Sequence, residues 1–224
     1  MSKDSEALFI LPPCGEQVTL LYQDEHFLLI NKPPRLLSVP GRHPLNRDSV
    51  IARLQDDFPD ASIVHRLDFD TSGIMVIPLN KPSLSNISRQ FQAREVDKTY
   101  VAIVNGLLEA EQGTVDLPIA ADQENRPKYK ICRQTGKPSA TEYRVISRDF
   151  AADTTRVELH PITGRSHQLR LHMQAIGHPI VGCEFYASKE ALNKAPRLLL
   201  HARELVFAHP VSGERISGHS EPPF

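Results

Sequence analysis

Runs of Val, Ile, Leu, Thr and Tyr between polar turns recur along the chain and predict more strands than helices. Seven such runs stand at residues 18–22, 27–30, 73–79, 99–105, 140–147, 154–161 and 198–208. Helical spacing of apolar residues predicts four helices, at residues 48–58, 82–94, 166–176 and 188–194. Strands in series with few helices and no regular alternation predict an α+β fold with a large, mainly antiparallel mixed sheet.

The pattern continues without a Gly/Ser-rich linker or a break in composition, so we predict a single domain over residues 18–224 after an N-terminal tail of residues 1–17. No apolar run approaches the roughly 18 residues that a membrane span needs. The first six residues lack the basic and then apolar pattern of a signal peptide. We therefore expect a soluble, cytoplasmic protein, and a monomer, because no spare apolar helix face stands out.

The three cysteines, Cys14, Cys132 and Cys183, are an odd number and stand more than 50 residues apart. This spacing fits neither a disulfide framework nor a clustered zinc site. We expect them to act as small, mostly apolar side chains in a reducing compartment.

The charges nearly cancel over the whole chain, with 26 Lys and Arg against 27 Asp and Glu. This balance excludes indiscriminate attraction to polyanions. The charges are nevertheless divided along the chain, because residues 126–172 carry 10 basic and 4 acidic side chains. Such a tract is typical either of a solvated face or of a surface that binds nucleic acid.

The densest cluster of ionisable side chains is His65, Arg66, Asp68 and Asp70, followed by Thr71-Ser72-Gly73. One interpretation is a structural turn in which an aspartate accepts backbone N–H groups and pairs with Arg66. A calcium loop of the EF-hand type is disfavoured, because its twelfth position requires Glu and is Leu79 here. A metal-dependent phosphohydrolase using Asp68 and Asp70 fits the spacing only in part.

The same cluster, His65-Arg66-Leu67-Asp68 followed by Thr71-Ser72-Gly73, resembles the signature of the RluA family of RNA pseudouridine synthases. Further motifs stand in the family's order: Asn31-Lys32-Pro33, Lys98-Thr99-Tyr100, Thr163-Gly164-Arg165-Ser166-His167-Gln168-Leu169-Arg170-Leu171-His172, Gly177-His178-Pro179-Ile180-Val181-Gly182 and Leu200-His201-Ala202. Together they cover about residues 20–210. The resemblance implies the pseudouridine synthase catalytic fold and the isomerisation of uridine to pseudouridine in structured RNA.

The reaction breaks the bond between uracil N1 and ribose C1′ and rejoins the base through C5, without oxidation or a group donor. No cofactor and no metal ion are therefore expected. The resemblance implies that Asp68 is the catalytic carboxylate and that Arg165, just before a predicted helix, is the cation that keeps it ionised. Tyr100 is the third expected catalytic residue, suited to stacking on the target uracil and to proton transfer from C5. Arg66 resembles the arginine that fills the space left by the flipped base.

We expect the remaining polar groups of these motifs to contact RNA or to support those that do. They are His65, Thr71, Lys98, His167, Arg170 and Lys32. The two lysines are candidates for phosphate contacts or for partners behind the site, and the helix residues are either RNA-facing or structural. The basic residues in 126–148 would then follow the phosphate backbone beside the site.

Two departures from the family pattern are visible. The chain has no room before its first strand for the S4-type RNA-binding domain that many relatives carry. Cys183 stands where the family usually has Asp, so any role of that carboxylate passes to Glu184 or is lost.

The length resembles a short bacterial branch whose substrates are the uridine at the 5′ start of the tRNA anticodon loop and one uridine of 23S ribosomal RNA. A phosphohydrolase and a non-catalytic RNA-binding or chaperone protein remain the alternatives.

Overall fold

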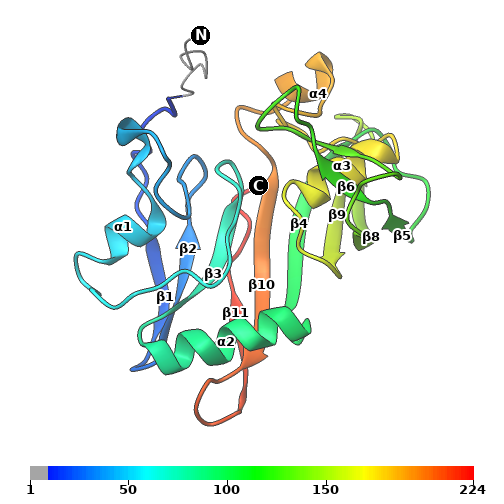
Figure 1. Ribbon diagram of the computed structural model, residues 1–224. Helices are drawn as coiled ribbons and strands as arrows, with labels where there is room; N and C mark the ends of the chain where they lie inside the picture. The colour runs from blue at the N-terminus through cyan, green and yellow to red at the C-terminus, as the bar shows by residue number, and fades with distance from the viewer. Residues whose placement is uncertain (1–9) are drawn as a thin grey trace.

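A mixed, mainly antiparallel sheet organises the molecule, whose computed structural model describes residues 10–224 (Figure 1). Within these residues, nine strands form the main sheet in the order β1-β2-β3-β10-β4-β9-β8-β5, and β11 pairs with β10 beside this path. Its strands are β1 (Thr19–Gln23), β2 (Phe27–Lys32), β3 (Ser72–Pro78), β4 (Asp97–Asn105), β5 (Gln112–Asp116), β8 (Ala140–Asp149), β9 (Thr154–Pro161), β10 (Leu200–Ala208) and β11 (Arg215–His219). The α+β prediction is confirmed.

A separate two-stranded ribbon is formed by β6 (Ile119–Ala121) and β7 (Tyr129–Ile131). The ribbon strands, β5 and β11 are missing from the sequence prediction. Their segments have only three to five residues, too few to show a clear apolar period. Their hydrogen-bonded neighbours, rather than their own composition, make them strands.

Three of the helices begin after residues whose side chains cap them. Helix α2 (Lys81–Ala93), which runs along the lower edge of the sheet in Figure 1, follows Asn80, whose side chain accepts the N–H of Ser83. Helix α4 (Lys189–Asn193) follows Ser188 in the same way. Helix α1 (Val50–Leu54) is shorter than the predicted 48–58, because Ser49 is its cap and Pro59 disfavours helical geometry in the residue before it. A short 3-10 turn covers Pro44–Asn46.

Helix α3 (Gln168–Ala175) begins two residues later than predicted. The residue before it, His167, has φ 56°, in the left-handed region, so the helix does not extend back to residue 166. Leu169 and Met173 are buried as the apolar spacing predicts, and Ile176 packs against the same core. This start decides which side chains of the motif face the sheet.

Two hydrophobic clusters meet at β10, which contributes residues to both and forms a seam with β3. One is built around β2, β3 and α1, the other around β4, β9 and α3, and Tyr100 packs against both. At the seam the two strands are parallel and pair only at Ser72 with His201 and Gly73 with Ala202. Gly73 has φ 121°, and a Cβ there would lie 2.2 Å from the carbonyl oxygen of Ala202. Only glycine allows this approach.

The N-terminal tail expected at residues 1–17 falls partly outside the described residues, and residues 10–18 form no helix or strand. Across residues 10–224, no helix is long and apolar enough to cross a membrane.

Candidate active site

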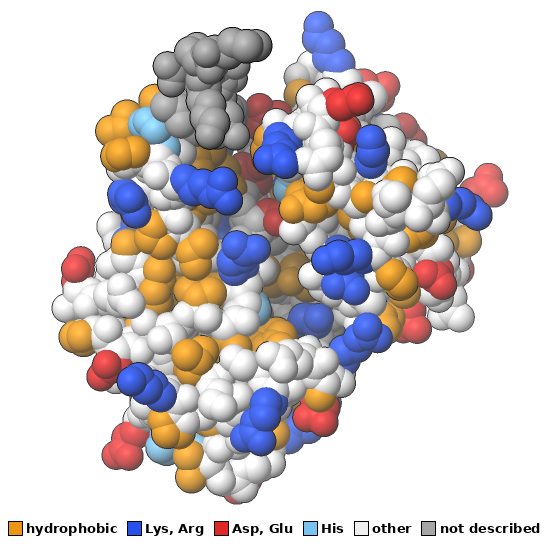
Figure 2. Space-filling model, in the orientation of Figure 1, with side chains coloured by type: hydrophobic (Ala, Val, Ile, Leu, Met, Phe, Trp, Pro, Cys, Tyr) orange, Lys and Arg blue, Asp and Glu red, His pale blue; other side chains and the backbone are white. Residues whose placement is uncertain are grey.

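A cleft of about 1220 Å³ opens above the seam, and Figure 2 shows basic side chains on both sides of the hollow. Its lining comes from the loop before α1, the loop before β3, helix α2, the start of β4, the ribbon and the start of α3. Of the residues expected in the site, those in the lining are His65, Arg66, Asp68, Thr71, Lys98, Tyr100, Arg165, His167 and Arg170. One cleft thus brings together nine of the ten side chains expected in the site.

Asp68 lies in a loop that is anchored on both sides of it. Before it, the Ser38 hydroxyl donates to the carbonyl of Leu67 at 2.9 Å and accepts the N–H of Leu67 at 3.1 Å. After it, the ammonium of Lys32 donates to the carbonyl of Phe69 at 3.1 Å. The Asp68 side chain is 29% exposed, so it faces the cleft from a fixed backbone.

The guanidinium that faces Asp68 belongs to Arg170, whose Nη1 lies 3.5 Å from Oδ2 of the carboxylate. Arg170 is 2% exposed, and its guanidinium lies over the rings of Phe185 and Tyr186, at 5.0 and 5.4 Å from their centroids. These contacts hold a charge beside Asp68 that water reaches only from the cleft. The imidazole of His167 also lies close to the carboxylate, with its Nε2 3.9 Å from the same oxygen.

Arg165 does not form the ion pair with Asp68 that the sequence predicts. Its Nε donates instead to the carbonyl of Pro138 at 3.3 Å, at the rim of the cleft. The reason is the late start of α3: Arg165 precedes the helix in the loop, whereas Arg170 lies on its buried face. Arg170, expected only as an RNA-facing or structural group, occupies the place assigned to Arg165.

Tyr100 lies across the seam from the Asp68 loop, on β4, where it pairs with Ala202 of β10 and Leu159 of β9. Burial, and next the charge of Asp68, raise the pKa of Tyr100 above its ordinary value, so the phenol stays protonated at neutral pH. A flat ring and a neutral hydroxyl therefore face the cleft beside a carboxylate.

His65 is fixed to the protein rather than free for RNA. Its Nε2 accepts the N–H of Val76 at 3.1 Å, and its ring stacks on Phe91 of α2 at 4.7 Å. Burial, and next the charge of Lys98, lower the pKa of His65 to about 3, so the ring is neutral. Burial also lowers the pKa of Lys98. Both side chains nevertheless border the cleft.

Lys32 is excluded as a phosphate contact, because it is 0% exposed. Its ammonium donates to the carbonyls of Pro33, Leu36 and Phe69 at 2.8, 2.7 and 3.1 Å. Burial lowers the pKa of Lys32 to about 7. The alternative role, support from behind the site, matches this position.

Cys183 replaces the expected carboxylate without transferring its role to a neighbour. Its buried thiol accepts the Nε–H of Arg170 at 3.3 Å, whereas Glu184 is exposed. Within the described residues, Nη2 of Arg170 has no hydrogen-bond partner. Among residues 10–224, Asp68 is the one carboxylate that forms an ion pair with this guanidinium.

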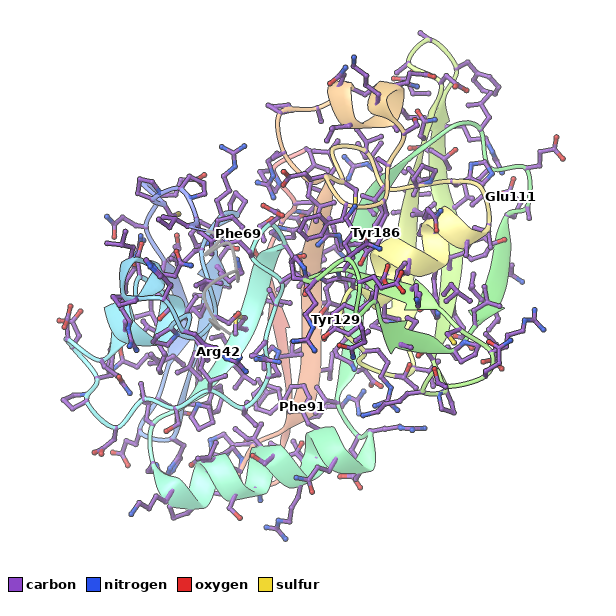
Figure 3. All side chains as sticks on the ribbon, turned by 45° about the horizontal axis from the view of Figure 1, so that its top comes forward. Arg42, Phe69, Phe91, Glu111, Tyr129 and Tyr186 are labelled. Carbon is purple, nitrogen blue, oxygen red and sulfur yellow. The ribbon has the colours of Figure 1, made fainter. Side chains whose placement is uncertain are left out.

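The basic tract at 126–148 is divided by the fold. Arg126 and Lys128 border the cleft from the ribbon, but Arg144 pairs with Glu158 and Arg148 with Glu111 elsewhere on the sheet. The sequence prediction also missed other residues of the site, namely Arg42, Phe91, Arg94 and Tyr129 in the cleft lining and Phe185 and Tyr186 behind it. Figure 3 labels Arg42, Phe91, Tyr129 and Tyr186. The tract's position signalled Arg126 and Lys128, and no local motif signalled the others.

A carboxylate held against a buried arginine, a protonated phenol and a cation-lined cleft define a site for chemistry on a polyanionic substrate. Within residues 10–224, no group of three or more His, Cys, Asp or Glu could hold a metal ion. The metal cluster that a phosphohydrolase based on Asp68 and Asp70 needs is therefore not formed by these residues, and the comparisons below do not support that alternative.

Comparison with known proteins identifies the class. The family model described as RNA pseudouridylate synthase matches residues 26–175. The chain belongs to this family and is an RNA pseudouridine synthase, an isomerase. It is 54% identical to the "Dual-specificity RNA pseudouridine synthase RluA" of Salmonella typhi and 53% identical to that of Escherichia coli K12. Each alignment covers 92% of this chain and 94% of the relative.

Solved structures agree with this assignment. "Human RNA Pseudouridylate Synthase Domain Containing 1" superposes with a TM-score of 0.80 at 31% identity, covering 95% of this chain and 86% of that one. "Human RNA Pseudouridylate Synthase Domain Containing 4" gives a TM-score of 0.73 at 26% identity, with 92% and 88% covered. The pseudouridine synthase fold expected from the motifs is thus confirmed.

Proposed function

We propose that this enzyme has two kinds of RNA substrate, modifying the uridine at the 5′ start of the tRNA anticodon loop and one uridine of large-subunit ribosomal RNA. The names of its relatives in Salmonella and Escherichia, which describe dual specificity, support the proposal. The absence of bulk positive charge also supports it, because selection must then rely on local RNA geometry and base flipping. Its site of action would be the cytoplasm, and its working form a monomer.

The observation that carries the chemistry is the contact between Asp68 and Arg170 beside the ring of Tyr100. In our proposal Asp68 acts at the ribose, either by adding to C1′ and leaving again, or by taking a proton from the sugar and returning it when the new bond forms. The N1–C1′ bond breaks, the C5–C1′ bond forms, the proton leaves C5, and one proton is placed on N1. Arg170 places its positive charge beside the carboxylate, and Tyr100 stacks on the flipped uracil.

The cations at the mouth of the cleft have a different role in the proposal. Arg66, exposed on the Asp68 loop, fills the space that the flipped base leaves in the RNA. Arg165 and Lys98, together with the ribbon residues Arg126 and Lys128, contact phosphates. Thr71 and His65 shape the wall of the cleft from buried positions.

Replacement of Asp68 by Asn tests the catalytic assignment. We expect tritium release from RNA labelled at uridine C5 to be lost, with RNA affinity and the melting temperature retained. The matched control is Asp57→Asn, at an exposed turn after α1, which should release tritium at the wild-type rate. Turnover by the Asp68→Asn protein would refute the role of Asp68.

The RNA targets are tested by mapping pseudouridine in tRNA and ribosomal RNA from a deletion strain. Both positions should lose the modification, and the wild-type gene should restore it while the Asp68→Asn gene does not. Restoration of growth or RNA folding by the Asp68→Asn gene would instead favour the non-catalytic chaperone function. Loss at only one position would reduce the proposal to a single substrate.

A further inference from the structure

Tyr186 lies behind the cleft, in the segment between Cys183 and α4, and its hydroxyl joins two parts of the active site. It accepts the backbone N–H of Tyr129, on the ribbon, at 2.9 Å. It also lies 2.6 Å from Nδ1 of His167, the residue that precedes α3. Figure 3 shows Tyr129 and Tyr186 close together between the sheet and α3. Tyr186 does not line the cleft itself.

The hydrogen bond between Tyr186 and His167 determines where the imidazole carries its proton. Burial lowers the pKa of His167 to about 4 and raises that of Tyr186 to about 12, so at neutral pH both groups are uncharged. A neutral imidazole has one N–H and one lone pair. If Nδ1 carried the proton, the lone pair of Nε2 would face the carboxylate of Asp68 at 3.9 Å. That arrangement is repulsive, so the tyrosine donates to Nδ1 and the proton resides on Nε2.

We propose that Tyr186 is a positioning residue that holds His167 in the Nε2–H tautomer, so that this N–H is directed at Asp68. The proposal deepens the proposed function, because it rests on Asp68 being the catalytic carboxylate. Around His167, the charged side chains are Asp68 and Arg170, while Tyr129, Phe185 and Tyr186 surround the ring with edge and stacking contacts. Among residues 10–224, Tyr186 is the ring neighbour whose side chain hydrogen-bonds to Nδ1.

The same hydroxyl links the ribbon to the carboxylate. The ribbon carries Arg126 and Lys128 at the cleft. The N–H of Tyr129 donates to a lone pair of the Tyr186 hydroxyl oxygen, which leaves the hydroxyl hydrogen free to be donated to His167. The position of the ribbon and the orientation of the His167 ring are therefore coupled through the Tyr186 hydroxyl. A hydrogen bond to the far ring nitrogen commonly fixes the tautomer and ring orientation of a functional histidine.

The test is Tyr186→Phe, which keeps the ring over Arg170 and removes the hydroxyl. Nitrogen-15 NMR of the imidazoles should show His167 as the Nε2–H tautomer in the wild type and as a mixture of tautomers in the variant. We expect kcat for tritium release to fall about tenfold, with KM for RNA changed less than twofold. Tyr143→Phe, which removes a hydroxyl on β8 outside the cleft lining, should leave the tautomer and kcat unchanged.

A double-variant cycle shows whether Tyr186 acts through His167. In a His167→Gln background, Tyr186→Phe should cause no further loss of kcat, because the group it orients is gone. Multiplying losses would overturn the proposal, as would an Nδ1–H tautomer in the wild type or an unchanged tautomer in Tyr186→Phe. If the wild type itself released no tritium, the proposed function would fail, whereas the NMR result would still decide the role of Tyr186.

Discussion

Lys32 offers a quantitative prediction because its buried ammonium both costs stability and holds the catalytic loop. Replacing it by Met keeps a side chain of similar length and removes the donor to Pro33, Leu36 and Phe69. Phe69 follows Asp68 directly, so the substitution frees the loop on that side. We expect the variant to fold but to release tritium more slowly, since Asp68 loses one of its two anchors.

The magnitude follows from the pKa, which burial lowers from 10.5 to about 7. Between these values the unfolded chain holds a proton that the folded protein has released, so the free energy of unfolding rises with pH. The cost of burial is fully present below pH 7 and is relieved as the pH approaches 10.5. At 1.36 kcal/mol per pKa unit, the shift of the Lys32 pKa corresponds to a change of about 5 kcal/mol in the free energy of unfolding. Roughly 2.5 kcal/mol of this change falls between pH 7 and pH 9.

Urea unfolding of the wild type and of Lys32→Met, at pH 7, 8 and 9, measures this contribution. Other titrating groups contribute equally to both proteins, so they cancel in the difference between the two free energies of unfolding. This difference should shift in favour of the wild type by about 2.5 kcal/mol over this pH range. Lys81→Met, at the exposed start of α2, controls for the loss of a surface lysine. Parallel curves for wild type and Lys32→Met would mean that Lys32 stays charged to pH 9, and the reasoning would be wrong.

Three further outcomes follow from the structure. Gly73→Ala should lower the free energy of unfolding by at least about 3 kcal/mol in urea titrations, since the alanine Cβ would meet the Ala202 carbonyl. A loss below about 1 kcal/mol would contradict this close approach. Lys128→Ala should weaken RNA binding and reduce the slope of log affinity against log salt by about 1, whereas an unchanged slope would place Lys128 outside the RNA interface. A thiol reagent should modify Cys14 and Cys132 in the folded protein but Cys183 only after unfolding; three fast reactions would contradict its burial.

The sequence predicts the large strands and the capped helices because their signals are local. Ser188 marks a helix start by itself, and alternating or continuous apolar runs mark β2, β3, β4, β9 and β10. The ribbon and the edge strands escape prediction because they are stabilised by partners distant in the chain. Periodicity contains no information about such partners.

The site shows the same division between local and distant information. Motif order brings the expected residues together, but the choice between Arg165 and Arg170 depends on the left-handed conformation of His167, which sets where α3 begins. Likewise, the exposure of Lys32 and the position of Tyr186 follow from packing over long separations. A motif identifies which residues take part, whereas the backbone decides which of them touches the carboxylate.

The seam between β3 and β10 also has a consequence for biosynthesis. Ser72 and His201 stand 129 positions apart, so β3 is made long before the strand that completes its parallel edge. Every residue of β3 is buried in the finished protein, and until β10 emerges this apolar strand has a free edge that can pair wrongly. The nascent enzyme is therefore most open to aggregation or chaperone binding between the synthesis of residue 78 and that of residue 202. Its active site, which lies on the seam, can form only after that interval ends.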